Sequence, residues 1–584
     1  MVGRIVSFLQ KEIGGLHEAA YLLGIAALAS QFLALFRDRI LASVFGAGQT
    51  LDVYYGAFRL PDILFATIGS LVSASVLIPF LSHKFKQSDE TGKHFFDAIF
   101  SVFFVIMIGA AAVAWFLAPW IVPVLLPGFR GTDAMPTVVF LTRMLLLSPI
   151  FLGFSNLFAS ITQLKSRFFV YALSPILYNC GIIVGALFFA PLWGITGLVL
   201  GVVLGAVAHM AIQLPFIVSQ GLFPVFVRVK EWVIAREAVL VSVPRTIAIS
   251  ANELAELILI SLASLLSVGS ISVFNFSFNL QSVPLSIIGV SYSLAAFPTL
   301  AKYMSEGNSK KYVEYVVTTA RHIIFLCIPV AALFIVLRAH IVRVILGSGE
   351  FSWSDTRLTA AALALFVLSL VAQSLILLFT RARYSTGNTR TPLIINVSAS
   401  LFIVGFSFLL LHLYKIVPAF HMVLARALRV EDIAGTDVLV LPLAFSIGVT
   451  LAAVFHVVSF HREFRAAHAG LTEVGRTFIQ TLCVSILMGL VAYASLNLFD
   501  AVFNVSELSE VSTFFGIFLQ GFAAGIIAIA VGIGAFVVLK NREIVEMRDT
   551  IRQRLWKRSS TTAASAAPQT GEPVVVGPDA EDVI

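Results

Sequence analysis

The 584-residue chain is 59% hydrophobic and only 12% charged, with a formal net charge of +7. A soluble domain carries about 25% charged residues, so this composition excludes an ordinary soluble protein and indicates a chain that lies in a bilayer. The three cysteines show no metal-ligand spacing, and we expect neither a metal site nor a disulfide framework. The sequence contains no phosphate-binding glycine loop, no HExxH motif and no plausible nucleophile–base pair, so we expect no enzyme.

Fourteen apolar stretches are long enough to cross a bilayer, which takes about 20 residues per helix. Backbone groups in lipid must pair within their own segment, and these stretches do not alternate as strands do. The predicted fold is therefore an all-α membrane bundle. The stretches lie near residues 19–46, 53–81, 95–126, 137–163, 168–190, 194–218, 239–267, 271–301, 313–346, 358–380, 392–414, 438–460, 477–499 and 512–539.

The basic residues predict an orientation for these helices. With a cytoplasmic N-terminus, 26 Lys and Arg residues fall on the cytoplasmic side and six fall in outer loops. This bias follows the positive-inside rule and predicts that both termini are cytoplasmic. Because the basic residues are spread over eight separate loops, they suit membrane topology and anionic lipid headgroups, and nucleic acid is a poor interpretation.

Residues 41–81 reappear in outline at residues 262–300. The offset of about 220 residues spans six helices, an even number, so the two copies have the same orientation and form a parallel repeat. A membrane protein built from two copies of one bundle is most often a transporter with its pathway between the halves. The matched glycines and prolines are Gly48 with Gly269, Gly69 with Gly289, and Pro79 with Pro298.

The repeat divides the chain into two six-helix lobes and an appendix. The basic segment that follows the last span is expected to be either a helix on the inner leaflet or a stop-transfer flank. The outer loop at 415–437 is long enough to contain a short surface helix. The expected parts are a cytoplasmic segment at 1–18, lobes at 19–218 and 239–460, two further helices at 477–539, a basic cytoplasmic segment at 540–558 and a disordered tail at 559–584.

Ionisable residues inside the spans are the candidate functional residues, because each costs roughly 2–3 kcal/mol or more at mid-membrane. Arg37 and Arg59 lie at similar depth in the outer half of the first helical hairpin, with Asp38 and Asp62 close to them in sequence. One interpretation is a cationic patch that faces a cavity between the lobes and grips phosphate with the fork of arginine donors. The alternative is an internal Arg–Asp network that locks the first two helices together.

Two carboxylates lie near the middle of the seventh span. Glu253 and Glu256 are three residues apart and therefore share one face of the helix. They could pair with the arginines of the first hairpin across the lobes, or bind a coupling proton or cation. The other interpretation is an ion pair with Arg245 or Arg321 inside the second lobe.

Several motifs carry a resemblance to a known family. The stretch FRDRILASVFGAGQTLDVYYGAFRLPD at 36–62 resembles the signature of the first two helices in the MviN/MurJ-type lipid II flippases. Residues 347–363 and 384–397 are similar to the family's segments around helix 10, and Arg321 fits its helix 9. The resemblance implies the fold of the multidrug/oligosaccharidyl-lipid/polysaccharide (MOP) exporters, with two lobes, a central cavity and two extra helices that form a lipid-binding groove.

The resemblance also implies a function. The family moves lipid II, a lipid-linked peptidoglycan precursor, from the inner to the outer leaflet of the bacterial cytoplasmic membrane as its lobes rock between inward- and outward-open states. No cofactor is expected, and transport could be coupled to the membrane potential or to a monovalent cation. The expected partners are the lipid-linked precursor, membrane lipids and a cytoplasmic partner of the tail. The candidate substrate-binding residues are Arg37, Asp38, Asp52 and Arg59, and the candidates for coupling or gating are Glu253, Glu256 and Arg321.

The sequence departs from the family at three arginine positions, which fall here on Gln31, Phe65 and Asn279. Part of the family's pyrophosphate clamp is therefore missing. This loss keeps an alternative open, in which the chain exports another polyprenyl-linked glycan or amphiphile on the same fold. A non-transporting membrane scaffold is the third interpretation.

Overall fold

The predicted all-α membrane fold is confirmed in the computed structural model of the chain. The described part consists of helices joined by short 3-10 and π segments, and it contains no strand. Ten of its helices are long and apolar enough to span a membrane, and a pair bent by 42° at residues 368–369 makes eleven. The described residues are 16–72, 74–234, 236, 253–464, 471–503, 514–546 and 548–549.

The remaining three of the fourteen expected spans fall on interrupted or partly described helices. The first span is α2, which carries three charged residues at 37–39, and the second is broken into α3, α4, η1 and α5. Of the seventh span, residues 253–264 are described and are helical. The first part of the chain contains α2 (Leu16–Phe45), α3 (Gln49–Ala57), α4 (Arg59–Thr67), η1 (Gly69–Val72), α5 (Ala74–Gln87), α6 (Asp89–Leu125), η2 (Pro127–Phe129), α7 (Ala134–Leu145), α8 (Leu147–Leu164), α9 (Phe168–Val184), η3 (Gly185–Phe189), α10 (Ala190–Trp193), α11 (Ile195–Ala211), α12 (Leu214–Ser219) and η4 (Val229–Trp232).

The second part of the chain has the same general construction. The short helix α21 lies in the loop at 415–437 and confirms the surface helix expected there. In chain order the elements are α14 (Ser270–Pro284), η5 (Leu285–Val290), α15 (Ser291–Ser305), α16 (Ser309–Val336), α17 (Arg338–Leu346), α18 (Trp353–Val367), α19 (Leu370–Ser385), α20 (Arg390–Ile416), α21 (Pro418–Leu428), η6 (Thr436–Leu439), α22 (Val440–Glu463), α23 (Leu471–Phe503) and α24 (Phe514–Val538).

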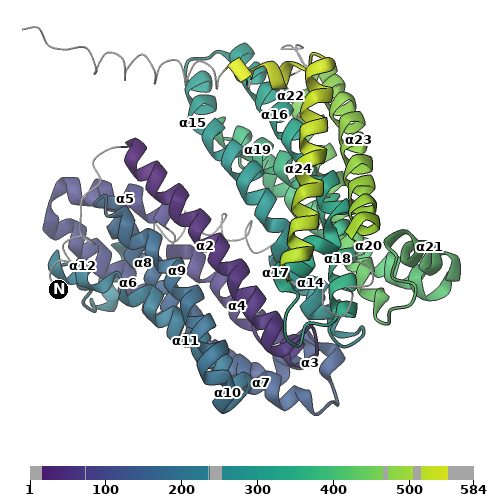
Figure 1. Cartoon of the computed structure of the whole chain (residues 1–584). Helices are drawn as coiled ribbons and strands as arrows, with labels where there is room; N and C mark the ends of the chain where they lie inside the picture. Colours follow the sequence, from purple (N-terminus) through teal and green to yellow (C-terminus); the bar gives the residue numbers. More distant parts are fainter. Residues whose placement is uncertain are drawn as a thin grey trace, which may run out of the picture.

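The helices form two groups that meet at one end and diverge toward the other (Figure 1). The first group runs from α2 to α12, and the second runs from the described helical residues 253–264 through α14 to α22. They contact each other through α2 and α3 on one side and α14 and α17 on the other. We call the end at which α2 finishes and α3 begins the distal end. The opposite end, where α2 begins and α24 finishes, is the proximal end.

A shared apolar core joins the two groups near the distal end. Leu41 and Leu51 of the first group belong to the same buried cluster as Phe276 and Phe351 of the second. The ring of Phe276 packs edge-on against Tyr55 at 6.0 Å and against Phe351 at 5.9 Å. Burial of this apolar surface favours contact between the groups at this end.

The internal repeat is visible in the helix breaks. Gly69 lies in the 3-10 segment η1 and its matched Gly289 lies in the π segment η5. The matched prolines Pro79 and Pro298 then fall inside the helices that follow, α5 and α15. Glycine and proline weaken the helical hydrogen-bond ladder, so both copies are interrupted at the same place. The exact boundaries of the two lobes stay a prediction.

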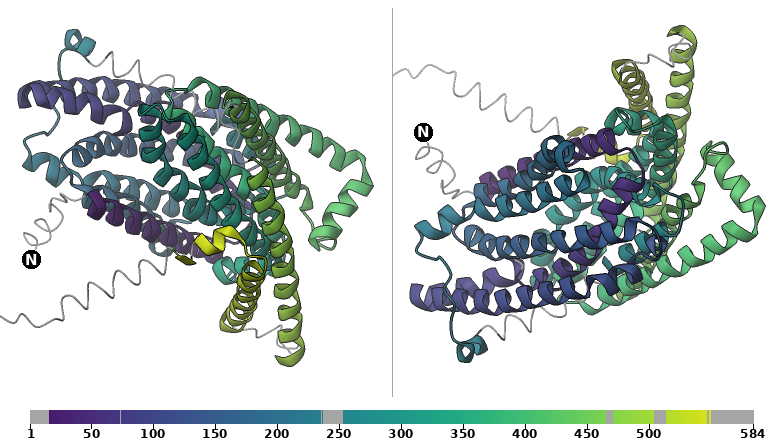
Figure 2. Two further views of the ribbon diagram at one scale, coloured as in Figure 1. Left: turned by 90° about the horizontal axis from the view of Figure 1, so that it is seen from above. Right: turned by 90° about the horizontal axis from the view of Figure 1, so that it is seen from below.

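The last two helices lie at the edge of the second group (Figure 2). Helix α23 packs along α16 and against α24, and α24 also contacts α17. The predicted disordered tail at 559–584 and the N-terminal residues 1–15 lie outside the described residues.

Candidate functional site

The strongest polar link between the two groups is the carboxylate of Asp52 in α3. It accepts hydrogen bonds from the backbone N–H of Gly269 at 2.6 Å and from the N–H and hydroxyl of Ser272 at 2.8 and 2.6 Å. Both donors lie at the N-terminus of α14, where unpaired amides and the helix dipole favour an anion. Asp52 is buried, so this contact caps a helix of one group with a side chain of the other.

Arg37 of α2 is compensated by its neighbour in sequence. Its Nε and Nη2 donate to Asp38 Oδ1 at 3.0 and 2.7 Å, and its Nη1 donates to Asn179 of α9 at 2.9 Å. The other oxygen of Asp38 accepts from Asn279 of α14 at 3.0 Å. This chain of four side chains therefore begins in the first group and ends in the second.

Arg59, the first residue of α4, also reaches the second group. Its Nη1 lies 3.2 Å from Glu256 Oε1 and 3.9 Å from Asp62, and its Nη2 donates to Asn275 at 3.5 Å. Glu253 lies one turn before Glu256 and is half-buried. The cluster formed by Arg37, Asp38, Asn279, Arg59 and Glu256 is called the interlobe cluster below.

These contacts bear on the sequence-based alternatives, and the roles of these residues in binding or coupling stay predictions. Within the first two spans, the described Arg–Asp pairs join residues of the same helix, Arg37 with Asp38 and Arg59 with Asp62, so they do not lock the first two helices together. Glu256 pairs across the groups with Arg59. The alternative partner Arg321 pairs elsewhere, and Arg245 lies outside the described residues.

Two of the residues at the family's arginine positions bridge the groups as neutral donors. Gln31 donates to Ser282 at 3.4 Å, and Asn279 donates to Asp38. Phe65 instead places its ring against Gly69 in the broken second span. Asn179 and Asn275 also belong to these contacts and are not among the predicted site residues. The available signal was the presence of amide side chains within predicted membrane spans.

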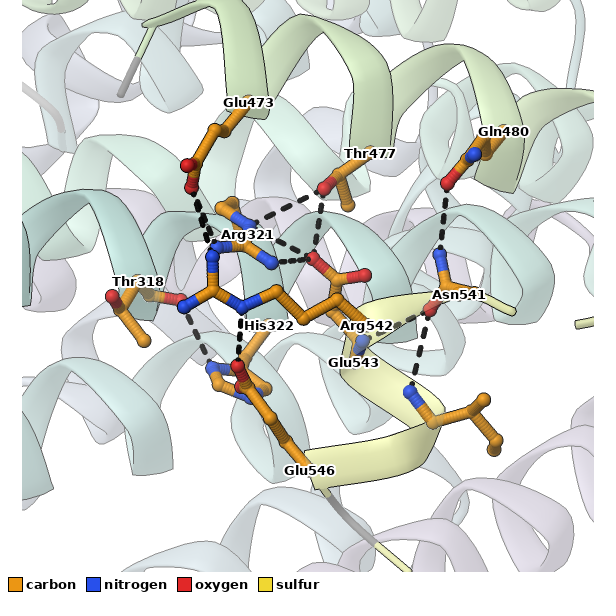
Figure 3. A network of polar contacts seen from close by, with 11 residues as sticks. Thr318, Arg321, His322, Glu473, Thr477, Gln480, Asn541, Arg542, Glu543 and Glu546 are labelled. Carbon is orange, nitrogen blue, oxygen red and sulfur yellow. Dashed lines mark hydrogen bonds and ion pairs between the residues drawn. The ribbon is translucent and has the colours of Figure 1, made fainter. Parts of the chain in front are cut away.

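Arg321 belongs to a separate cluster at the proximal end (Figure 3). Its side chain projects from α16 and donates to Glu543 at 2.8 and 2.6 Å, to Glu473 at 3.0 Å and to Thr477 at 3.3 Å. Thr477 also donates to Glu543 at 2.8 Å. The side chains of Arg321 and Glu543 are almost fully buried, at 5% and 2% exposure.

The partners of Arg321 come from α23 and from the segment that follows α24. This segment begins with Asn541, which donates to Gln480 at 3.3 Å and accepts from the N–H of Glu543 at 3.1 Å. Arg542 joins Glu473 at 3.3 Å. We call the Arg321–Glu473–Thr477–Glu543 contacts the proximal clamp (Figure 3). The described start of the predicted basic segment is therefore packed into the protein.

A large groove lies away from the interlobe cluster, among α16 to α19, α21, α22 and α23. It encloses about 1330 Å³, and its walls are mostly aliphatic and aromatic side chains. One of the two last helices, α23, supplies a long wall of the groove, whereas none of the lining residues comes from the described part of α24. The groove thus depends on the packing of α23 against α16, which the proximal clamp supports.

Comparisons with known proteins agree with this architecture. The model of the family described as lipid II flippase MurJ matches residues 41–428, more than half of the chain. The lipid II flippase MurJ of Burkholderia cenocepacia is 25% identical over 373 residues, which cover 62% of this chain and 72% of that protein.

Solved structures share the fold. A structure described as lipid II flippase MurJ in an inward closed conformation has a TM-score of 0.69 at 20% identity, covering 91% of this chain and 100% of that chain. An inward-facing MATE-family multidrug resistance transporter of the MOP superfamily has a TM-score of 0.61 at 14% identity, covering 75% of this chain and 95% of that chain. At these identities the two structures establish the fold alone, and they confirm the predicted exporter fold.

The proximal clamp yields a stability prediction. Burial acts to raise the pKa of Glu543, but hydrogen bonds from Thr477 and Arg321 outweigh it and hold the pKa below its usual range. Glu543→Gln should destabilise the protein by about 3 kcal/mol, the low end for a broken buried pair. Thermal unfolding of the purified protein at pH 7 measures this loss. Glu546→Gln is the matched control, because the ion pair of Glu546 with Arg542 is more exposed and worth roughly 0–1 kcal/mol.

The same clamp should respond to acid. A carboxylate with a lowered pKa stabilises the folded state above its unfolded pKa of about 4.3, and that stabilisation is lost as the pH falls through the folded pKa. The wild type should therefore lose its additional stability relative to Glu543→Gln below about pH 4. A difference in stability between the two proteins that is unchanged at low pH would show that the charge of Glu543 does not support the clamp.

Proposed function

Because the chain belongs to the lipid II flippase MurJ family, we propose that it moves lipid II from the inner to the outer leaflet of the bacterial cytoplasmic membrane. The observation that carries the proposal is the pair Arg37 and Arg59. Arg59 pairs with Glu256 across the two groups of helices, and Arg37 pairs with Asp38, which accepts a hydrogen bond from Asn279 of the second group. Arginine suits a diphosphate because its planar fork offers several donors to one anion. Charges in membrane helices are costly, which favours a role in transport.

The orientation of the molecule in the membrane determines from which side a substrate can enter between the lobes. The excess of basic residues in the predicted cytoplasmic segments supports a cytoplasmic position for the proximal end. The lobes are joined at the distal end by Asp52 and by the shared apolar core. The present arrangement is then closed toward the outer side, and an outward-open state requires these distal contacts to break.

Substrate binding requires the arginines to exchange partners. In the present state the positive charges of Arg37 and Arg59 are compensated by Asp38 and Glu256. A diphosphate that enters between the lobes competes with these carboxylates for the same donors. The freed Glu256, with Glu253 one turn away, then binds a proton or a monovalent cation, so that uptake of an anion is matched by uptake of positive charge.

The apolar groove serves the lipid tail in this account. Its aliphatic walls avoid the cost of placing a long hydrocarbon chain against polar groups. The headgroup crosses between the lobes while the tail stays in an apolar environment.

An exporter of another polyprenyl-linked glycan is the second candidate. The observation that favours it is that Gln31 and Asn279 are neutral and already engaged with Ser282 and Asp38. Fewer arginines are therefore available for a pyrophosphate than the family resemblance implies. Both candidates share the polyprenyl phosphate chemistry and differ in the glycan.

The lipid II assignment is tested by rescue of a bacterium depleted of its own lipid II flippase. The wild-type chain should restore growth, and Arg37→Ala should not, because the mutant lacks a donor for the diphosphate. Arg143→Ala is the matched control, since Arg143 also lies within a span but contacts Trp115 in the first lobe. Membrane levels of all three proteins are compared by immunoblot.

Two results of this rescue would contradict the proposal. Growth with Arg37→Ala at wild-type levels would remove Arg37 from the pathway. Failure of a well-expressed wild type, together with export of a different polyprenyl-linked glycan, would favour the second candidate.

The exchange of partners at Arg59 gives a binding prediction. Glu256→Gln should raise the affinity for a polyprenyl diphosphate about tenfold, because the variant releases Arg59 from its competitor at a gain of roughly 1.4 kcal/mol. The affinity of the variant should also become independent of sodium concentration, whereas that of the wild type rises with sodium. Titration of the purified protein at two sodium concentrations measures both effects.

Glu306→Gln serves as the control for this titration, because Glu306 pairs with Lys302 at the proximal surface. It should behave as the wild type. Equal affinity and equal sodium dependence of Glu256→Gln and the wild type would argue against an exchange at Arg59.

A further inference from the structure

The groove among α16, α22 and α23 has a regular apolar wall. Phe478, Leu482, Ile486, Leu490 and Tyr493 of α23 recur every three or four residues and therefore share one side of the helix. All five side chains are exposed, between 39% and 62%. An apolar stripe of this length on one helix indicates a surface that is covered by a ligand or by lipid.

The length of the groove argues for a long apolar ligand. The lining residues of α23 extend from Phe478 to Asn497, a rise of about 28 Å at 1.5 Å per residue. The hydrocarbon core of a bilayer is about 30 Å thick, so the tail of a phospholipid in one leaflet would occupy about half of the groove. A polyprenyl chain is long enough to occupy all of it.

The distal end of the groove differs in chemistry from the rest. Arg338, Arg357 and Arg429 line the groove there, beside Tyr493. Arg357 is held by Asp432: its Nη1 donates to Oδ2 and its Nη2 donates to Oδ1, each at 2.7 Å. Among the described residues, Arg338 and Arg429 form no ion pair with a carboxylate. Arg338 donates to the backbone oxygens of Ile335 and Leu428 at 2.8 and 3.2 Å.

Arg429 is held in place from both sides. Its backbone has φ of +60°, a left-handed conformation that residues with a side chain rarely adopt. Arg357 Nη2 donates to the backbone oxygen of Arg429 at 2.5 Å. The guanidinium of Arg429 donates to the Tyr493 hydroxyl at 3.1 Å and lies 5.6 Å from the centre of its ring. Arg357 and Tyr493 thus position Arg429 at the mouth of the groove.

We propose that Arg338 and Arg429 form a second phosphate site, which binds the diphosphate of a polyprenyl lipid on the distal side while the lipid's tail lies in the groove. Two guanidinium groups without carboxylate partners match the charge of a diphosphate. The interlobe cluster and this distal mouth are separate sites, so the first would receive the headgroup and the second would hold it after crossing. This inference rests on the proposed function, because it takes the occupant to be the transported class of lipid.

The test places a photo-crosslinking side chain in the groove of the full-length protein in lipid nanodiscs. Leu490→p-benzoylphenylalanine lies in the groove, and Leu487→p-benzoylphenylalanine is the matched control, because Leu487 is exposed on the same helix within one turn but does not line the groove. The probe is a polyprenyl diphosphate with a radioactive phosphate. Labelling is expected at position 490 and not at position 487.

The arginines are then tested in the same assay. Arg338→Gln with Arg429→Gln should reduce labelling at position 490 about tenfold, because the diphosphate loses its donors. Arg426→Gln should label as the wild type, since Arg426 pairs with Glu431 on the surface of α21. Unchanged labelling in the double variant would overturn the phosphate site. Equal competition by phosphatidylglycerol would overturn a polyprenyl lipid as the occupant.

Failure of this inference is distinguishable from failure of the proposed function. A wild type that rescues growth but is not labelled at position 490 would overturn the distal site alone. Labelling at position 490 that depends on Arg338 and Arg429, in a chain that does not rescue, would support the site and count against lipid II as the substrate.

Discussion

The arrangement of the two lobes depends on one buried carboxylate. Asp52 would be costly to bury without partners, and all of its described donors, at Gly269 and Ser272, come from the opposite lobe. The same contact pairs amides at the start of α14 that the helix leaves unpaired. Contact between the lobes at the distal end therefore provides hydrogen-bond partners both for the Asp52 carboxylate and for the amides at the start of α14. It also sets the position of α2 and α4, and so places Arg37 and Arg59 against the second lobe.

Two of the buried or half-buried ion pairs differ in what must happen to them during transport. Contacts such as Arg59 with Glu256 cross between the lobes, and rocking of the lobes or entry of an anion exchanges them. The contact of Arg321 with Glu543 lies at the proximal end of the second lobe and is almost fully buried. Removing Arg321 would leave Glu543 as a buried charge without its ion pair, and removing Glu543 would leave Arg321 with the more exposed Glu473 alone. This contact therefore keeps α23 and the segment after α24 fixed beside the groove.

The sequence predicts much of the fold because long apolar spans and matched Gly and Pro positions are local signals. Gly69 and Gly289 mark the same helix break in each copy. The partners of Asp52 could not be predicted, because two of its three donors are backbone amides, which leave no trace in residue type. The role of Glu543 could not be predicted for another reason. It lies in a segment whose composition indicates a basic flank, and it is 222 residues from Arg321 in the sequence. The count of regular spans among the described residues also differed. The second span is broken into α3, α4, η1 and α5, the seventh is only partly described, and α2 carries three charges although it is continuous.

The most direct measurement locks the distal contact and follows transport. Glu350 N–H donates to the backbone oxygen of Ser43 across the lobes at 2.9 Å, so Ser43→Cys with Glu350→Cys, in a chain without its native cysteines, should form a disulfide on oxidation. Delivery of lipid II to the opposite leaflet of reconstituted vesicles is then measured before oxidation, after it and after reduction. The account predicts that oxidation stops delivery and reduction restores it. Delivery at an unchanged rate by fully cross-linked protein would contradict it.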